Sequence, residues 1–239
     1  MAIKMTPPKE IIKRALSEDR LKLLEHEAFE LAKYYEIPVP EVYLVRTPKE
    51  AYDLADSVGY PIALKIVSPD IIHKSDVGGV KLHLNSREEV ARAVNEMLKT
   101  VSLRAPNARI IGVIMYQEAR QGIEVIVGGL RDSVFGAAVM FGLGGVFVEV
   151  FKDVSFRIAP LSFNDALEMI SEIQSKQVLE GYRGQKPVDK KAIADILVKT
   201  SKLMLENDEI ESIDLNPVMA YDNGAMVVDV RVILRKVPH

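Results

Sequence analysis

The sequence contains no cysteine among its 239 residues. A disulfide framework, a thiol nucleophile and a cysteine-ligated zinc site are therefore excluded. An excess of basic residues is missing too, because 31 Lys and Arg residues face 34 Asp and Glu residues and leave a formal net charge of −3. Proteins that bind nucleic acid usually cluster an excess of Lys and Arg, so no nucleic-acid partner is expected.

Membrane and export segments are also missing from the sequence pattern. The N-terminus lacks the apolar core of a signal peptide. The longest apolar run, residues 134–148, has 15 residues and contains four glycines, which makes it shorter and more interrupted than a membrane-spanning helix. With 48% hydrophobic and 27% charged residues, the composition is that of a soluble globular protein, and we expect a cytoplasmic protein without a membrane partner.

Helical and strand patterns predict an α+β protein with two lobes. Two capping boxes, which begin at Thr47 and Ser86, predict helix N-termini, and Asp189 is a third candidate N-cap. Helices are expected at 21–35, 48–58, 87–101, 163–174 and 190–206, and strands at 42–45, 61–67, 80–84, 109–117, 123–129, 134–140, 155–158, 211–218 and 225–234. The expected division is a lead segment (1–20), a first lobe (21–115) and a second lobe (116–239), with a cleft between the lobes.

The last two strands predict a candidate metal site. Asn223-Gly224 between apolar runs indicates a hairpin with a two-residue turn. Such a turn sets a register in which Asn216 lies opposite Arg231 and Val218 lies opposite Asp229. Because strand side chains alternate, one face carries Asp214, Asn216, Asp229 and Arg231, and the other carries Ile213, Leu215, Val228, Val230 and Val232. Mg²⁺ prefers such oxygen ligands and needs only one or two carboxylates. An ordinary solvated sheet face is the alternative.

Lys65 and the loop that follows its strand form a candidate phosphate site. Lys65 lies inside an apolar strand, so its ammonium must reach water or meet an anion. The loop ends in Gly78-Gly79, where glycines allow backbone N–H groups to approach phosphate oxygens, although a plain β-turn would explain the same residues. His73, in the same loop, offers a nucleophilic nitrogen near pH 7 or is simply a surface histidine.

Other candidates have less support from their sequence context. Glu118 ends an apolar run at the expected joint, where backbone groups suit an adenine edge. The 142–145 glycine segment is a flexible loop or a tight turn, and it matches neither a Walker loop nor a dinucleotide fingerprint. Arg131 and Arg231 are possible further charges. The remaining histidines, at positions 26, 83 and 239, have no constellation around them.

Together these segments resemble the ATP-grasp fold and, more narrowly, the β subunits of ADP-forming acetyl-CoA synthetases (acetate–CoA ligases, ADP-forming). The matching motifs are ALSE (15–18), IPVP (37–40), YPIALK (60–65), HKSDVGGV (73–80), FGLGG (141–145) and IDLNP (213–217). They cover nearly the whole chain in family order, and the β subunit of succinyl-CoA synthetase is a more distant relative. The resemblance implies that a nucleotide is held in the cleft between the two lobes.

The resemblance also implies a reaction and a set of roles. The reaction is acyl-CoA + ADP + phosphate ⇌ carboxylic acid + ATP + CoA, with Mg²⁺ and with His73 as a phosphohistidine relay that Asp214 steadies. The implied nucleotide-binding residues are Lys65, Lys74, Gly78, Gly79, Glu118 and Glu124. The implied metal ligands are Asn216, Asp229 and Asp214.

A partner subunit is expected because the sequence shows no CoA-binding Rossmann-type domain. The resemblance implies a CoA-binding α subunit in an α2β2 heterotetramer. Two alternatives stay open. A stand-alone ATP-grasp carboxylate ligase would not need His73, and a non-catalytic nucleotide-binding regulator would not need Asp214, Asn216 and Asp229.

Overall fold

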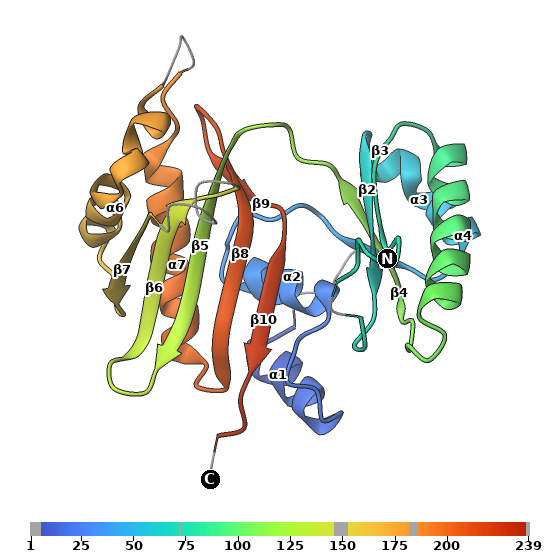
Figure 1. Ribbon diagram of the computed structural model, residues 1–239, viewed down its shortest axis with the longest axis horizontal. Coiled ribbons are helices and arrows are strands. Elements are labelled where there is room, and N and C mark those ends of the chain that lie inside the picture. The colour runs from blue at the N-terminus through green and yellow to red at the C-terminus, as the bar shows by residue number, and fades with distance from the viewer. Residues whose placement is uncertain (1–5, 72, 146–152, 182–185, 238–239) are drawn as a thin grey trace. The chain divides into compact units, whose positions relative to one another are not determined.

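The computed structural model describes residues 6–71, 73–145, 153–181 and 186–237, which form two compact units. Unit 1 contains Leu24–Glu30 and Pro40–Glu118, and unit 2 contains Thr6–Leu23, Leu31–Val39 and the described residues from Ala119 onward. Both units combine helices with antiparallel strands, which confirms the α+β class (Figure 1). No helix in the described ranges is long and apolar enough to cross a membrane.

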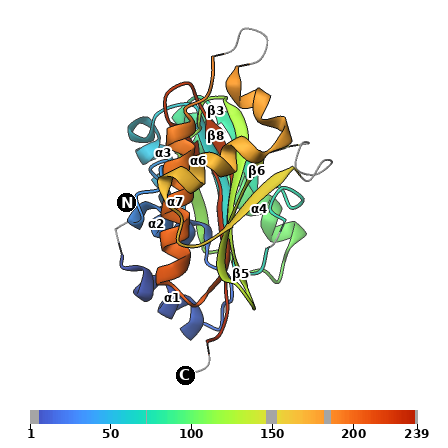
Figure 2. The ribbon, with the colours of Figure 1, turned by 90° about the vertical axis from the view of Figure 1, so that its left-hand side faces the viewer.

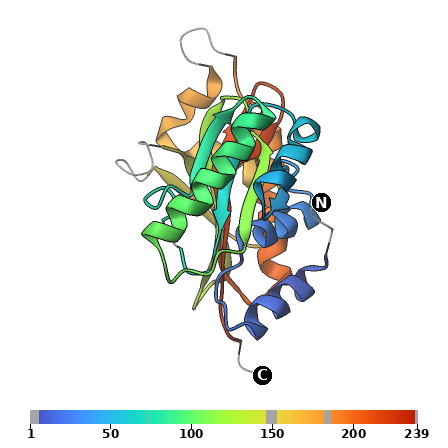
Figure 3. The same cartoon turned by 90° about the vertical axis from the view of Figure 1, so that its right-hand side faces the viewer.

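Unit 1 is built on a four-stranded antiparallel sheet with the strand order β1-β4-β2-β3. Its strands are β1 (Tyr43–Val45), β2 (Ile62–Val67), β3 (Val80–Leu84) and β4 (Gly112–Gln117), and its helices are α3 (Pro48–Val58) and α4 (Arg87–Arg104). Figure 3 shows both helices on one side of the sheet. The predicted N-caps are confirmed, because the side chains of Thr47 and Ser86 each accept a hydrogen bond from the N–H of the third helical residue.

The alternation of side chains in β2 decides where Lys65 points. Alternate residues of the two central strands are fully buried against the helices, namely Ile62, Leu64, Ile66, Val113 and Met115. Lys65 lies between two of these residues and opposite Ile114 of β4, so its side chain projects from the face away from α3 and α4.

Unit 2 contains a six-stranded antiparallel sheet with the order β10-β8-β5-β6-β7, in which β9 also pairs with β8. The strands are β5 (Ile123–Asp132), β6 (Gly136–Leu143), β7 (Val154–Ile158), β8 (Ile210–Ala220), β9 (Ala225–Val227) and β10 (Val230–Leu234). Helices α6 (Phe163–Glu172) and α7 (Lys190–Glu206) pack against one face, as Figure 2 shows. The 3₁₀ helix η1 (Gln174–Glu180) follows α6.

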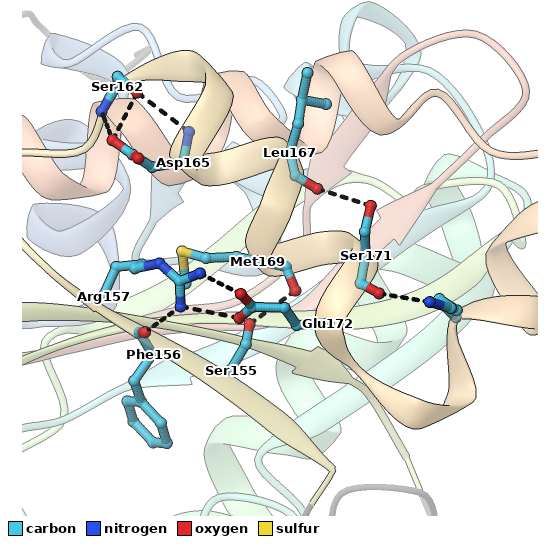
Figure 4. A network of polar contacts seen from close by, with 10 residues as sticks. Ser155, Phe156, Arg157, Ser162, Asp165, Leu167, Met169, Ser171 and Glu172 are labelled. Carbon is cyan, nitrogen blue, oxygen red and sulfur yellow. Dashed lines mark hydrogen bonds and ion pairs between the residues drawn. The ribbon is translucent and has the colours of Figure 1, made fainter.

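Polar contacts attach α6 to β7 (Figure 4). Ser162 and Asp165 form a capping box at the N-terminus of α6. The Ser155 hydroxyl donates to the Met169 carbonyl oxygen at 2.9 Å, and Arg157 forms an ion pair with Glu172.

Several predicted boundaries differ from the structure. Helix α1 (Pro8–Ser17) was not predicted, and its buried side chains include Ile11, Ile12 and Ala15; residues 1–5 of the expected lead segment lie outside the described ranges. The expected helix at 21–35 is α2 (Glu25–Tyr34). Strand β6 begins at residue 136 rather than 134, because an Asp132 oxygen accepts the N–H groups of residues 134 and 135 and forms a turn there.

The predicted register of the C-terminal hairpin is wrong by two residues. Val218 lies opposite Val227 rather than Asp229, and a four-residue loop, residues 221–224, replaces the two-residue turn. The reason is a contact with the N-cap of α7: the Asp189 N–H donates to the carbonyl oxygen of residue 221 at 2.7 Å, and an Asp189 side-chain oxygen accepts the N–H of Gly224 at 3.0 Å. These two bonds hold both ends of the longer loop.

Candidate functional site

In unit 1 the structure brings Lys65 and the glycine loop together. Lys65 is half-buried and lies opposite Val80, the first residue of β3. The loop of residues 73–79 folds back on β2, because Ile66 donates its N–H to the Gly79 carbonyl oxygen at 2.8 Å. Lys65 therefore lies one residue from the point at which the loop is attached to the sheet.

The two loop glycines are required by the packing of the loop itself. Gly78 has a φ of 76°, a conformation that favours glycine. A Cβ atom on Gly79 would lie 2.5 Å from Ile66 Cγ2 and 3.0 Å from the Lys74 carbonyl oxygen. The N–H groups of Gly78 and Gly79 donate to the carbonyl oxygens of Ser75 and Lys74, at 3.0 and 2.7 Å. In this conformation both glycine N–H groups are thus engaged inside the loop, not directed to an anion.

His73 and Lys74 are neighbours with opposite environments. The side chain of His73 is exposed, so its ring is accessible to a reacting group. The side chain of Lys74 is only 12% exposed and forms an ion pair with Glu25 of α2, whose side chain is 6% exposed. Sequence reasoning missed Glu25. The signal was weak, a single glutamate directly after the apolar pair Leu23-Leu24.

Glu118 follows β4 and is held by His83. One Glu118 oxygen accepts the His83 backbone N–H at 2.9 Å, and the other lies 3.1 Å from Nδ1 of the same histidine. The pairing register of β2 with β3 shifts between Ile62 and Leu64, and His83 has a φ of 61°. This bulge turns His83 toward Glu118. The expectation that His83 lacks a constellation is therefore wrong.

In unit 2 the hairpin brings its polar residues closer than predicted. Asn216 donates its backbone N–H to the Asp229 carbonyl oxygen at 3.2 Å, and Arg231 lies opposite Asp214. Asn216 and Asp229 are thus direct rather than diagonal neighbours across the strands. Asp214 and Asp229 are half-buried, and Asn216 and Arg231 are exposed. Four of the five residues predicted for the other face are buried, and Val228 is half-buried, so the separation of the two faces is confirmed for these four.

The donor set of this hairpin fits Mg²⁺ better than a metal that needs many protein ligands. Among the described residues no group of three or more His, Cys, Asp or Glu side chains is arranged to hold a metal ion. Mg²⁺ usually keeps several waters and takes one or two carboxylates together with substrate phosphates. Burial raises the pKa of Asp214, the Arg231 charge opposes that rise and the Asp229 charge adds to it. Oxygen atoms that could hold Mg²⁺ are thus present on Asp214, Asn216 and Asp229, on one face of the hairpin.

Glu124 lies beneath the glycine segment of residues 142–145. Its carbonyl oxygen accepts the Gly144 N–H at 2.7 Å, and a Cβ atom on Gly144 would lie 2.9 Å from Glu124 Cβ. The Glu124 side chain is exposed, and one of its oxygens would lie 3.5 Å from a Cβ atom on Gly145. The described part of this segment is therefore packed closely on β5, and residues 146–152 lie outside the described ranges.

Arg131 has a structural role. Its guanidinium donates to the carbonyl oxygens of Met204, Asn207 and Ile210 and pairs with Asp208. These hydrogen bonds satisfy carbonyl groups at and just after the C-terminus of α7. The charge of Arg131 is therefore engaged in the fold of unit 2.

Comparison with known proteins agrees with this fold. A family model of the ATP-grasp domain matches residues 14–234. The β subunit of acetate–CoA ligase [ADP-forming] I from Pyrococcus furiosus is 51% identical over 226 residues, which cover 95% of this chain and 97% of that subunit. Acetate–CoA ligase [ADP-forming] I from Archaeoglobus fulgidus is 44% identical over 234 residues, and the match covers 98% of this chain but 34% of that longer protein.

Solved structures of acetyl-coenzyme A synthetase 1 from Ca. Korarchaeum cryptofilum are also similar. The complex of that protein with coenzyme A and Ca-AMPCP has a chain that is 48% identical, with a TM-score of 0.93 and coverage of 96% of this chain and 100% of the solved chain. Another complex, with Mg-AMPPCP, has a phosphohistidine segment pointing towards the nucleotide binding site. The chain described here belongs to the ATP-grasp family and, within it, to the β subunits of ADP-forming acetate–CoA ligases. The resemblance drawn from the sequence motifs is confirmed.

Proposed function

We propose that this chain is the nucleotide-binding β subunit of an ADP-forming acetyl-CoA synthetase and that it transfers a phosphoryl group between His73 and ADP. One observation carries the proposal: His73 is exposed at the start of a loop that is attached to β2 one residue from Lys65. A nucleophilic ring and a cation close to the same loop suit phosphoryl transfer, in which positioning and charge neutralisation supply most of the catalysis.

The transfer step is a reversible displacement at phosphorus. A terminal oxygen of ADP attacks the phosphorus of phosphohistidine, the N–P bond breaks, and ATP and a free imidazole result. In the opposite direction the His73 nitrogen attacks the γ-phosphorus of ATP, and the bond from that phosphorus to the bridging oxygen breaks as ADP leaves. Lys65 would offset the phosphate charge.

The nucleotide contacts follow from each unit separately. In unit 1 we assign Lys65 to the phosphates and Glu118 to the nucleoside, and in unit 2 we assign Glu124 to the nucleotide. Asn216 and Asp229 would hold the Mg²⁺ that accompanies it, and the ion would neutralise phosphate charge.

A CoA-binding companion subunit completes the proposal. The match covers 97% of the Pyrococcus β subunit and 34% of the longer Archaeoglobus enzyme, and the likeness to a protein that is named as a β subunit supports a companion chain. We propose an α2β2 heterotetramer in which the companion forms acyl phosphate and CoA from acyl-CoA and phosphate. The phosphoryl group then passes from acyl phosphate to His73 as the carboxylic acid is released, and this chain forms ATP.

The test is phosphorylation with γ-labelled Mg-ATP in the presence of the companion subunit. We expect an acid-labile, base-stable label in the wild type and its loss in His73→Asn. Ser75→Ala is the matched control, because Ser75 is exposed in the same loop and a serine phosphate would show the opposite stability. A label that persists in His73→Asn, or a wild type that binds Mg-ATP but never labels, would refute the relay.

A further inference from the structure

We propose that Glu25 is a positioning residue for the loop that carries His73, and that its carboxylate acts through Lys74. This inference rests on the proposed role of His73. Glu25 is the first residue of α2, 49 positions before Lys74 in the sequence, and both lie in unit 1. Their ion pair joins this helix to the loop.

The burial of Lys74 distinguishes it from its neighbours. His73, Ser75 and Asp76 are exposed, whereas the side chain of Lys74 is 12% exposed and that of Glu25 is 6% exposed. The loop therefore presents the ring of His73 to solvent while the next residue turns inward. A side chain fixed at position 74 restrains the backbone from which the His73 ring projects.

The backbone of Lys74 is also the point at which the loop closes. Its carbonyl oxygen accepts the Gly79 N–H at 2.7 Å, and Gly79 in turn is bonded to Ile66 of β2. Arg104 of α4 donates to the Asp76 carbonyl oxygen at 3.0 Å. Displacement of Lys74 would thus be passed to Gly79 and, through it, to the attachment of the loop on β2.

The pair is sensitive to loss of one partner. Glu25 Oε2 is buried and has no hydrogen-bond partner among the described residues, so Lys74 is the counter-charge on which this carboxylate depends. Removal of one member of a buried ion pair leaves an uncompensated charge, whereas replacement of both by apolar residues of similar volume is often tolerated. The single variants are therefore expected to disturb the loop more than the double variant does.

The competing explanation is that Lys74 binds a nucleotide phosphate, the role implied by the family resemblance. That explanation predicts that Lys74→Met weakens Mg-ATP binding and that Glu25→Gln does not. If Lys74 anchors the loop, both substitutions slow phosphorylation of His73 by about 10- to 100-fold, since small misplacements of a reacting group have effects of that size. The affinity for Mg-ATP then stays within about twofold of the wild type.

The experiment compares Glu25→Gln, Lys74→Met and the double variant Glu25→Met/Lys74→Met, each with the companion subunit. Single-turnover labelling of His73, Mg-ATP affinity by calorimetry and thermal unfolding are measured together. Lys49→Met is the matched control, because Lys49 forms an exposed ion pair with Asp53 in the same unit. We expect slow labelling in both single variants, recovery in the double variant and wild-type labelling in the control.

The outcomes separate this inference from the proposed function. If the wild type labels and Glu25→Gln labels at the same rate, the inference about Glu25 is wrong. If the single variants fail to fold, the double variant tests the inference. Mg-ATP affinity and His73 labelling at wild-type levels in the double variant support the role of Lys74 as an anchor of the loop, and a weakened Mg-ATP affinity overturns it. If the wild type itself does not label His73, the proposed function fails.

Discussion

Arg131→Met should destabilise unit 2, because it removes the hydrogen bonds that Arg131 donates at the C-terminus of α7. The side chain of Arg131 is 9% exposed. Its guanidinium donates to the carbonyl oxygens of Met204 at 2.5 Å, Asn207 at 3.1 Å and Ile210 at 3.2 Å. The last carbonyl groups of a helix have no partner within the helix, and methionine offers them none.

The expected loss is about 3 kcal/mol. Hydrogen bonds from a charged donor contribute roughly 1.5–3 kcal/mol each, but three bonds from one guanidinium are not additive, and water can reach part of the vacated position. A cation at a helix C-terminus alone contributes up to about 2 kcal/mol. At roughly 2–4 °C per kcal/mol for a chain of this size, the unfolding temperature falls by about 6–12 °C. Arg131→Lys should lose less, since an ammonium keeps the charge but cannot span all three carbonyl groups.

Differential scanning calorimetry measures this shift, and Arg157→Met is the matched control. Arg157 pairs with Glu172 at the surface, with side chains 32% and 46% exposed, so its removal should cost no more than about 1 kcal/mol. If Arg131→Met unfolds within about 1 °C of that control, the role assigned to Arg131 is refuted.

Three further predictions concern the glycine loop, the N-cap of α7 and the metal ligands. Gly79→Ala should abolish labelling of His73, because the added Cβ would lie 2.5 Å from a side-chain carbon of β2; wild-type labelling would refute this. Asp189→Ala should lose about 1–2 kcal/mol near neutral pH. The N–H of Gly224 and two helical N–H groups lower the pKa of Asp189. The stability that Asp189 contributes is therefore present above the unfolded pKa of about 3.9 and is lost as pH falls through the folded pKa. In that lower pH range the urea unfolding curves of the variant and the wild type should converge. Asn216→Ala and Asp229→Ala should each weaken Mg²⁺-dependent nucleotide binding by at least about 10-fold in calorimetry; unchanged binding would refute the metal assignment.

The elements that depend on local sequence were predictable. The N-caps at Thr47, Ser86 and Asp189 are confirmed because a cap is a contact between residues two or three positions apart. Helix α1 was not predicted, although Ile11 and Ile12 are buried. Its apolar stripe is short and follows two prolines, and such a stripe indicates a helix only when a surface is known that covers it.

The hairpin shows how a local signal gives the right face and the wrong register. Asn223-Gly224 does turn the chain, with Gly224 at a φ of 85°, but Asp189 binds the loop from a helix that lies 35 positions earlier. The resulting shift of two residues preserves the alternation of side chains, whereas a shift of one would have reversed it. The polar face was therefore predicted correctly, while the direct pairing of Asn216 with Asp229 was not.

The candidate site shows a different limit, because the sequence displays chemical groups without showing which of them the protein itself engages. The N–H groups of Gly78 and Gly79 donate inside their own loop, and the charge of Lys74 meets Glu25. The partner of Lys74 is far away in the sequence, so no spacing rule would identify it. For this reason the proposed transfer relies on Lys65 for the phosphate charge, and the pair of Lys74 with Glu25 becomes a means of holding His73. Glu25 acts in this scheme only through Lys74. Substitution of Glu25 is therefore the most direct way to tell an anchored loop from a phosphate-binding lysine.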